Sequence, residues 1–320
     1  MVRIGIVLYP GAQMSAVLGL TDLFAIASGI AAQTNAAVQR LRVRHLVYTE
    51  MGGAPDVTFD SNPDAVEADD HCDVLILPPS LQPPISPEAA APLAHWLRDR
   101  HVEGSVLASV CGGAFLLGET GLLTGRSVTT HWSYVETFRS RFPEAKVDTD
   151  RLIIDGGDII SAGGLMSWTD LGLKLTDRFF GPVVMAETAR TMLVDPPGRE
   201  QRYYSGFVPR LTHGDAAILK SQHFLQANEG KEARLSVLAE QAGLEERTFS
   251  RRFQRATGLT ATDYAQRLRV AKAQELLQFS LQPIDNISLD VGYSDPGAFR
   301  KVFVRIVGLT PGDYRQRFHA

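Results

Sequence analysis

The segment Gly258-Leu259-Thr260-Ala261-Thr262-Asp263-Tyr264-Ala265-Gln266-Arg267 returns near the end of the chain as GLTPGDYRQR, residues 308–317. Seven of the ten positions are identical. Two phenylalanines, Phe249 and Phe253, return at the same spacing as Phe299 and Phe303. A self-similarity of this kind predicts two copies of one structural unit, and two copies are too few for a solenoid.

Each copy has the sequence pattern of a helix-turn-helix. In the first copy, Leu235, Leu238 and Ala239 are expected on one face of a short helix. Gly243 follows where a tight turn needs positive φ. A second helix is predicted over Glu246–Thr257, burying the two phenylalanines at i and i+4. The outward face of that helix then carries Arg247, Ser250, Arg251 and Arg255.

In the second copy, Ile284, Ile287 and Leu289 precede a turn at Gly292. Asp295 and Pro296 are typical of an N-cap and a first helical residue. The outward residues of the helix that they start are Gly297, Arg300 and Lys301.

A single helix, Tyr264–Phe279, is predicted to connect the copies. To read one face of B-DNA, the two recognition helices should lie about one helical turn apart, roughly 34 Å. Small residues together with Arg and Lys suit entry into the major groove and contact with phosphates, so we predict that the seven outward residues bind DNA.

The charge is divided unevenly between the two parts of the chain. Residues 211–320 carry 15 Lys and Arg against 12 Asp and Glu, hence +3, while residues 1–210 carry the remaining 17 and 24, hence −7. This asymmetry favours a polyanionic partner for the C-terminal part alone.

The stretch from about His213 to Phe318 resembles the DNA-binding domain of AraC/XylS-type regulators. Its most specific signature, from Ile287 to Arg315, contains Gly292-Tyr293, Phe299, Phe303 and Gly308-Leu309-Thr310-Pro311. Ala261 stands where the first copy could have matched Pro311, a minor departure. The resemblance implies a DNA-binding domain over residues 213–320, with promoter DNA and RNA polymerase as partners.

The N-terminal part alternates predicted strands and helices. Buried apolar runs such as Val74–Leu77 suit a parallel sheet covered on both faces, so we expect a doubly wound α/β domain over residues 1–195. Asp195-Pro196-Pro197-Gly198 breaks any helix and begins a predicted linker, 196–212. The expected strands are Arg3–Leu8, Arg42–Tyr48, Val74–Leu77, Ser105–Val110, Val128–Thr130 and Ile159–Ser161, and the expected helices include Ser15–Ser28, Pro87–Arg100 and Ala114–Thr120.

A strand-to-helix elbow is predicted at Cys111-Gly112-Gly113. Small residues let the backbone turn sharply, and a thiol at a helix N-terminus favours a thiolate or a bound anion. His131 follows the predicted strand Val128–Thr130 and is expected to approach Cys111. Arrangement and spacing over residues 2–195 resemble the ThiJ/PfpI superfamily, relatives of class I glutamine amidotransferases. The resemblance puts Asp22 at the position of an acid that contacts the elbow cysteine.

The resemblance also bears on whether the site catalyses. Ser133 stands where an amidotransferase has glutamate, and Gly112 where the peptidase-like branch has histidine. The order of the domains is that of GlxA-type AraC regulators, whose ThiJ/PfpI-like part is thought to sense a small molecule. We therefore expect no enzyme, with Cys111, His131 and Asp22 as vestigial catalytic candidates. The expected effector-binding residues are Asp22, Cys111, Gly112, His131, Trp132 and Trp168.

Other interpretations remain open. The chain could be a cysteine hydrolase, hydratase or glyoxalase-like enzyme with an accessory DNA-binding domain, or a constitutive DNA-binding protein whose N-terminal domain is an inert scaffold. Cys111 and both tryptophans could equally be core residues. If they line a pocket, Trp132, Trp168, Asp22 and Asp170 suit a cationic amine or quaternary ammonium effector, and the resemblance to regulators of amino-acid, betaine and carnitine metabolism fits that class.

The remaining features predict little chemistry. His71-Cys72-Asp73 has no second ligand pair, and no phosphate-binding glycine motif occurs, so neither a metal nor a cofactor is expected. Two cysteines make no disulfide framework. The apolar stretches look too short to span a bilayer. A cytoplasmic homodimer that binds a small-molecule effector and no membrane is the resulting expectation.

Overall fold

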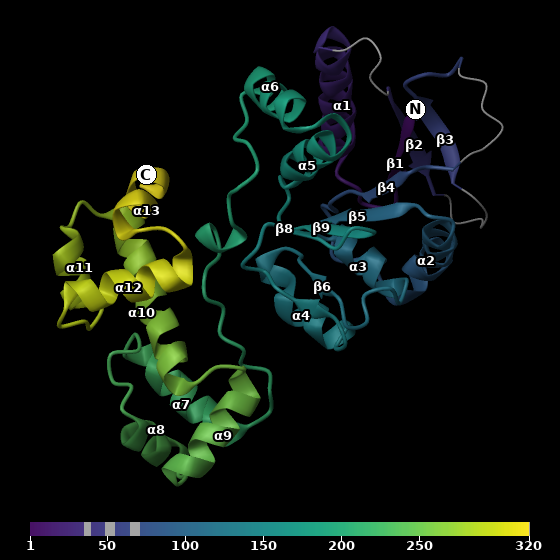
Figure 1. Cartoon of the computed structure of the whole chain (residues 1–320). Helices are drawn as coiled ribbons and strands as arrows, with labels where there is room; N and C mark the ends of the chain where they lie inside the picture. The colour runs from purple at the N-terminus through teal and green to yellow at the C-terminus, as the bar shows by residue number, and fades with distance from the viewer. Residues whose placement is uncertain (35–39, 49–54, 65–70, 320) are drawn as a thin grey trace. The chain divides into compact units, whose positions relative to one another are not determined.

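The computed structural model describes residues 1–34, 40–48, 55–64 and 71–319 (Figure 1). The chain divides into two compact units, residues 1–201 and 202–320. The division falls inside the segment that was expected to be a linker, and its residues are ordered: Gln201–Tyr203 form a short 3₁₀ turn. Each unit is described by itself.

The N-terminal unit is built on a seven-stranded sheet in the order β3-β2-β1-β4-β5-β9-β8. The five central strands are parallel, and the two edge strands are antiparallel to their neighbours. The mostly parallel α/β architecture is therefore confirmed, whereas the antiparallel edges were not predicted. The strands are β1 (Val2–Leu8), β2 (Leu41–Val47), β3 (Asp56–Asp60), β4 (Val74–Leu77), β5 (Val106–Val110), β8 (Ile153–Asp155) and β9 (Ile159–Ala162), and β6 (Ser127–Val128) pairs with β7 (Lys146–Val147) separately.

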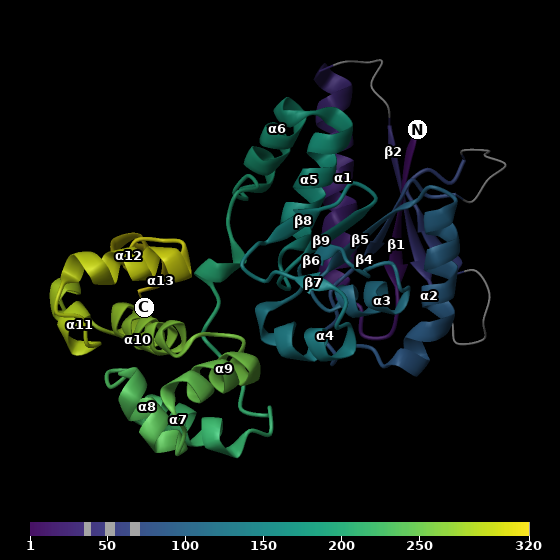
Figure 2. The ribbon, with the colours of Figure 1, turned by 60° about the horizontal axis from the view of Figure 1, so that its bottom comes forward.

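Helices cover both faces of this sheet (Figure 2). One face packs against α1 (Met14–Thr34) and α5 (Trp168–Phe180), with α6 (Pro182–Met192) beside them. The other face packs against α2 (Pro87–Val102) and α3 (Gly113–Glu119), followed by the short 3₁₀ turn Trp132–Tyr134 and α4 (Val135–Arg141).

Helix α1 corrects the expectation that no segment is long enough to cross a membrane. Its window Met14–Gln33 is long and apolar enough by length and composition, and no other helix in the described residues meets that test. One face of the helix is fully buried, because Leu20, Leu23 and Phe24 pack into the core over the sheet. The apolar character of α1 is thus accounted for by its place in the core.

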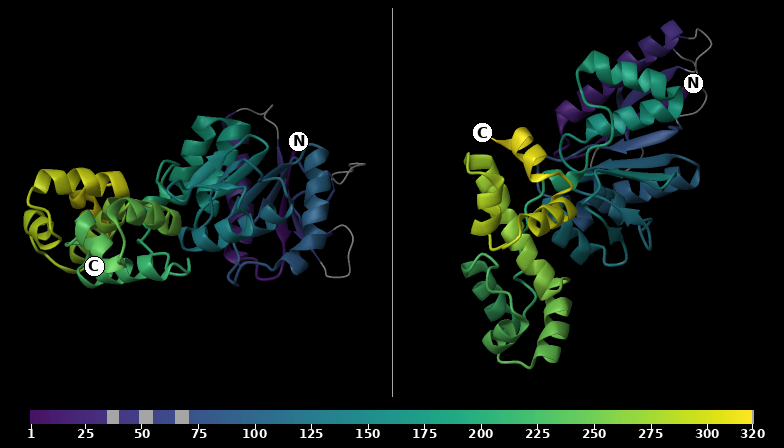
Figure 3. Two further views of the ribbon diagram at one scale, coloured as in Figure 1. Left: turned by 90° about the horizontal axis from the view of Figure 1, so that it is seen from below. Right: turned by 60° about the vertical axis from the view of Figure 1, so that its left-hand side comes forward.

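The C-terminal unit is all helical within the residues described and has two cores (Figure 3). The long helix α10 (Ala261–Phe279) contributes Tyr264 to the first core and Leu277 to the second. It begins three residues before the predicted connecting helix, because Thr260 caps it. The remaining helices are α7 (Ala216–Ala227), α8 (Leu235–Ala242) and α9 (Glu246–Thr257) around the first core, and α11 (Ile284–Asp290), α12 (Pro296–Val307) and α13 (Pro311–Phe318) around the second.

Two apolar residues of these short helices are exposed, one of them Leu235, which was expected on one helix face with Leu238 and Ala239. Leu235 is 40% exposed and Leu289 is 57% exposed, whereas Leu238, Ala239 and Ile287 are buried. Leu235 starts its helix and Leu289 lies in the last turn of the seven-residue α11. In helices this short, the buried face is only two or three residues wide, so the terminal apolar residues lie outside it.

Candidate functional site

The repeated Gly-Leu-Thr segment is the joint that ends each second helix and starts the next. Gly258 and Gly308 adopt φ of +76° and +86°, a left-handed conformation that favours glycine. Thr260 and Thr310 then cap the following helices with identical torsions, φ −68° and ψ 155°. Each threonine hydroxyl accepts a hydrogen bond of 3.1 Å from the backbone N–H three residues on. The identity between the copies therefore preserves a backbone turn.

The repeated aromatic residues build the two cores in the same way. Phe253 meets Tyr264 edge-on with ring centroids 5.4 Å apart, and Phe303 meets Tyr314 edge-on at 5.6 Å. All four rings are buried. Gly243 has positive φ, as predicted for its turn, and Gly292 adopts the same kind of conformation. Two helix-turn-helix frames of matching construction thus stand in one unit.

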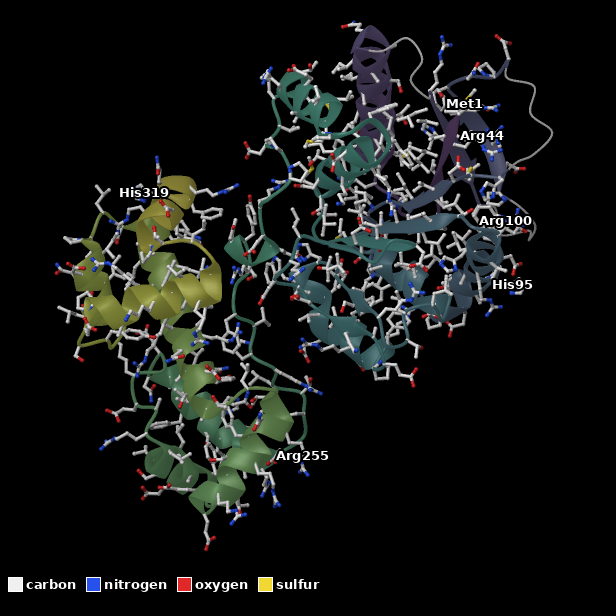
Figure 4. All side chains as sticks on the ribbon, viewed as in Figure 1. Met1, Arg44, His95, Arg100, Arg255 and His319 are labelled. Carbon is white, nitrogen blue, oxygen red and sulfur yellow. The ribbon has the colours of Figure 1, made fainter. Side chains whose placement is uncertain are left out.

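The outward face of α9 carries a stripe of unpaired cations. Arg247, Arg251 and Arg255 are exposed and lie four residues apart, so they share one face of the helix; Figure 4 labels Arg255. None of them forms a hydrogen bond or ion pair with another residue that the structure describes. Their neighbour Arg252 instead binds Asp215 through Nε and Nη2, at 2.9 and 2.6 Å. Ser250 is exposed, with its hydroxyl donating to the Glu246 carbonyl.

Helix α12 offers fewer free cations. Asp295 caps it, accepting from the N–H groups of Gly297 and Ala298, as predicted from the sequence. Arg300 is exposed, but its Nη2 lies 2.5 Å from Asp285 Oδ1. Lys301 is exposed and has no partner among the described side chains.

Arg305 is the α12 counterpart of Arg255, fifty positions later, and it was not singled out from the sequence. Its guanidinium donates to Gln266 Oε1 at 2.5 Å and lies 3.5 Å from Asp263 Oδ1. The two copies therefore share a frame but differ in their charged side chains: the three outward arginines of α9 have no partner among the described residues, whereas both arginines of α12 are bound to other side chains.

In the N-terminal unit, the predicted elbow lies at the end of β5. Cys111 has φ +53°, an uncommon conformation for a residue with a side chain. The chain turns into α3 at once, and at Gly113 a β-carbon would collide with the Leu77 carbonyl oxygen. Thr130 secures the turn from the side, its hydroxyl donating to the Cys111 carbonyl at 2.8 Å. Only glycine fits at position 113, which explains the second of the two glycines after the cysteine.

The environment of the thiol keeps it protonated. Cys111 is buried, and burial raises the pKa of its thiol to about 11, although the N–H groups of Gly112 and Gly164 lower it in part. Tyr9 lies close enough for its own pKa to be raised by burial and by Cys111. The expected thiolate is therefore corrected: desolvation outweighs the two N–H dipoles.

His131 is held away from a role as the base of Cys111. Its Nδ1 lies 2.7 Å from Ser133 Oγ and also accepts from the Ser133 N–H. The ring stacks beside Trp132, with centroids 5.3 Å apart, and burial lowers the pKa of His131. No hydrogen bond joins His131 to Cys111 in the described structure. The hydrogen-bond partner of His131 is instead Ser133, which stands where an amidotransferase has glutamate.

The two acids expected near the elbow do not serve it as free charges. Asp22 is exposed on α1 and forms no hydrogen bond with Cys111 within the residues described, so the contact implied by the resemblance is absent. Asp170 is only 2% exposed in its side chain and binds Arg199 through both oxygens, at 3.0 and 2.6 Å. Of the two carboxylates, Asp170 is therefore neutralised by Arg199, and Asp22 is not bonded to Cys111 in the described residues.

Trp168 is buried against α1, where a β-carbon at Gly19 would collide with its ring. Its indole Nε1 has no hydrogen-bond partner. Gly112 lies beside Ser80, with space for a β-carbon at 3.6 Å. Trp168 therefore packs against α1, and the ring of Trp132 lies beside that of His131.

Sequence reasoning missed Gln201, which is 2% exposed and lies among the elbow loops. Its Oε1 accepts from the Trp132 N–H at 2.9 Å, and its Nε2 donates to the carbonyls of Thr130 and Thr149, both at 3.0 Å. These partners are between 52 and 71 residues away in the chain. A buried glutamine in a segment that reads as linker gives no local signal.

Comparison with known proteins matches both units. The DJ-1/PfpI family matches residues 3–178, and a helix-turn-helix domain family matches residues 238–317. The chain is 26% identical over 216 residues to the HTH-type transcriptional regulator GlxA of Rhizobium meliloti, covering 67% of this chain and 66% of that protein. It is 26% identical over 226 residues to the HTH-type transcriptional regulator CdhR of Pseudomonas aeruginosa, covering 70% and 66%.

Among solved structures, an AraC family transcriptional regulator from Pseudomonas putida aligns with a TM-score of 0.45 and 17% identity, covering 60% of this chain and 100% of that one. The match to each of the two curated regulators spans 66% of its length.

Proposed function

We propose that this chain, which belongs to the DJ-1/PfpI family and carries a C-terminal helix-turn-helix domain of AraC type, is a DNA-binding transcription regulator. In this proposal, residues 213–320 bind promoter DNA, residues 1–195 bind a small metabolite, and 196–212 link the two. The observation that carries the proposal is the arginine stripe of α9, placed on the second helix of a helix-turn-helix frame.

Among the four arginines of α9, the described residues give an intramolecular partner only to Arg252, which binds Asp215. Arg247, Arg251 and Arg255 keep their donors free on one exposed face, where phosphates and guanine edges can accept them. The relatives named above are transcriptional regulators, which supports the same function.

Selection of bound duplexes from a random DNA library by the full chain tests the proposal. Enrichment of sequences with two conserved segments about one helical turn apart is the expected outcome. A second selection with the variant Arg247→Gln/Arg251→Gln/Arg255→Gln serves as control, and it should lose the segment read by α9. Failure of the wild-type chain to enrich any sequence would refute DNA readout.

The effector is proposed to bind at the elbow, beside Cys111, Gly112, His131, Trp132 and Trp168. It would shift the population of a homodimer in the cytoplasm toward the geometry that engages DNA and RNA polymerase. Calorimetric titration with amino acids, betaines, and neutral and anionic metabolites identifies the class. Since Asp170 is neutralised by Arg199, we expect neutral or anionic molecules to bind better than quaternary amines.

A second candidate, a cysteine enzyme with a DNA-binding tail, is favoured by one observation, the strained φ of Cys111. The raised pKa of the thiol and the engagement of His131 with Ser133 oppose it. Cys111→Ala separates the two: loss of a measurable turnover with unchanged DNA affinity supports the enzyme, and an altered effector response without turnover supports the sensor.

A further inference from the structure

The long helix α10 runs through both halves of the C-terminal unit (Figure 1). Arg269 stands where this helix passes from the first core to the second. Leu268, one position earlier, packs against the first core, and Val270, one position later, belongs to the second. Both recognition helices, α9 and α12, contact α10. The relative orientation of the two helix-turn-helix frames is therefore set around this position of the helix.

The guanidinium of Arg269 donates to three backbone carbonyls in two turns that are distant in the chain. Its Nε and Nη2 donate to the carbonyls of Gly230 and Lys231, at 2.8 and 3.0 Å, in the turn that follows α7. Its Nη1 donates to the Gly292 carbonyl at 3.1 Å, in the turn between α11 and α12, and its central carbon lies 5.3 Å from the centroid of the Tyr293 ring. The first turn lies in the half that carries α9 and the second in the half that carries α12, so one side chain holds both.

The two turns also pack closely around this side chain. At Gly230, where φ is +76°, a β-carbon would stand 2.6 Å from the Ala265 carbonyl oxygen on α10. At Gly292, where φ is +89°, a β-carbon would stand 3.2 Å from the Lys231 side chain and 3.6 Å from the central carbon of the Arg269 guanidinium. The turns of the two halves therefore approach each other across this guanidinium.

Helix α12 is connected to α10 at both of its ends. Arg269 binds the turn before it, and Arg305, near its end, donates to Gln266 Oε1 at 2.5 Å. Gln266 lies on the part of α10 that packs in the first core, between Tyr264 and Leu268. The connection through Arg305 joins two side chains, whereas Arg269 binds the backbone of both halves. Arg269 is therefore the residue that links the two frames most directly.

We propose that Arg269 fixes the separation and angle of the two recognition helices, and thereby determines which spacing between two DNA segments the protein accepts. The inference rests on the proposed function for its biological meaning. One base pair added between the segments moves one of them by about 3.4 Å along the duplex and by roughly 34° around it. A hydrogen bond is lost when donor and acceptor separate by about 1 Å. A duplex of the wrong spacing can therefore engage both helices only by breaking bonds of Arg269.

The first measurement uses the full chain without DNA. Nitroxide labels on Ser250→Cys and Lys301→Cys, at exposed positions of α9 and α12, report the distance between the two helices by pulsed electron–electron double resonance. We expect one narrow distribution of distances with Arg269 and a broader one in Arg269→Lys, because lysine keeps the charge but replaces the planar fork of three nitrogens by a single one. Single-cysteine variants control for labelling of the two buried native cysteines.

The second measurement compares affinities for two duplexes, the one that the wild-type chain selects and the same duplex with one base pair inserted between its two segments. Each net hydrogen bond lost shifts an equilibrium by roughly fivefold. If lysine retains one of the three bonds, the preference for the selected spacing should fall by up to about 25-fold. A residue that only stabilised the unit would change both affinities alike and leave their ratio as it was.

Arg267→Lys is the matched control, two residues earlier on the same helix. Arg267 has no hydrogen-bond or ion-pair partner among the side chains that the structure describes, so this variant should leave the distance distribution and the affinity ratio as in the wild type. Arg269→Met removes the charge as well and should broaden the distribution at least as much as Arg269→Lys. If Arg269→Met does not fold, the milder lysine variant still decides.

Two results would overturn the proposal. The same distance distribution in Arg269→Lys as in the wild type would show that Arg269 does not hold the two frames. A broader distribution with an unchanged affinity ratio would show that it does not determine the spacing. Selection of no DNA by the wild-type chain would refute the proposed function and the role in spacing with it, while the distance distributions would still show whether Arg269 links the frames.

Discussion

The unpaired arginines of α9 allow a prediction that needs no knowledge of the operator. Each phosphate contact contributes a slope of about −0.9 to the dependence of log affinity on log salt concentration for B-DNA. Arg247, Arg251 and Arg255 have no protein partner in the described structure, so their replacement by Gln removes only contacts with DNA. The triple variant should therefore lose up to about 2.7 of the slope for a non-specific duplex.

This loss is large enough to measure. Between roughly 50 and 200 mM salt, a slope difference of about 2.7 changes the ratio of the two affinities by roughly 40-fold. Fluorescence anisotropy with a labelled 30-base-pair duplex, titrated at several salt concentrations, gives the slope directly. Each single variant should contribute about a third of the effect.

Arg252→Gln is the matched control on the same helix. Its guanidinium is bound to Asp215, so the variant should lower the thermal stability of the C-terminal unit and leave the salt slope unchanged. The pKa of Asp215 is lowered chiefly by its hydrogen bond with Arg252, and stability from this pair is present above the unfolded pKa and is lost as pH falls through the folded one. An unchanged slope in the triple variant, or an equal loss in Arg252→Gln, would mean that α9 does not face DNA.

Three further predictions concern the elbow and the two cores. Because burial raises the pKa of Cys111 to about 11, its alkylation by iodoacetamide, followed by mass spectrometry, should be slow at neutral pH and should rise about tenfold per pH unit up to that pKa. The free energy of unfolding should fall as pH rises from the pKa of the unfolded thiol toward 11. A fast alkylation at pH 7 would contradict the raised pKa. Phe253→Ala should destabilise the C-terminal unit by about 3–5 kcal/mol in urea denaturation, whereas Phe279→Ala, at a residue 71% exposed, should change it by less than about 0.5 kcal/mol. Gly258→Ala should lower the free energy of unfolding by about 1–2 kcal/mol because of its left-handed backbone alone. Gly308→Ala should lower it more, since only there would Arg202 and Tyr203 meet the added carbon. Equal losses in the same assay would contradict the packing of Arg202 and Tyr203 on Gly308.

The C-terminal helices could be read from the sequence because their signals are local. The helix Glu246–Thr257 was predicted with its observed ends, since Phe249 and Phe253 fix its buried face and Gly258 fixes its end. Asp295 likewise fixes the start of α12. Caps and four-residue spacings act within one turn of helix, so they survive without knowledge of the fold.

The elbow was also predicted, because Cys111 and its glycines mark a sharp turn by their size alone. Which side chains gather around it could not be read in the same way. Asp22 was placed by resemblance, but its helix face depends on how α1 packs on the sheet. Asp170 suggested a free charge until Arg199 was found beside it, 29 residues later. Gln201 had no signal at all, because every partner that holds it is distant in the chain.

The difference between the two recognition helices gives the C-terminal unit a polarity. If the two helices lie in successive major grooves, α9 contacts the DNA backbone with arginines that have no partner to give up in the described structure. Arg300 of the second helix has an internal partner, Asp285, with which DNA would compete. Both side chains of that pair are more than half exposed, so the competition is worth at most about 1 kcal/mol. The operator would then be asymmetric: the half-site under α9 would mainly anchor the protein, and the half-site under α12 would mainly select the sequence. Inverting the operator in place would therefore change how the protein binds it.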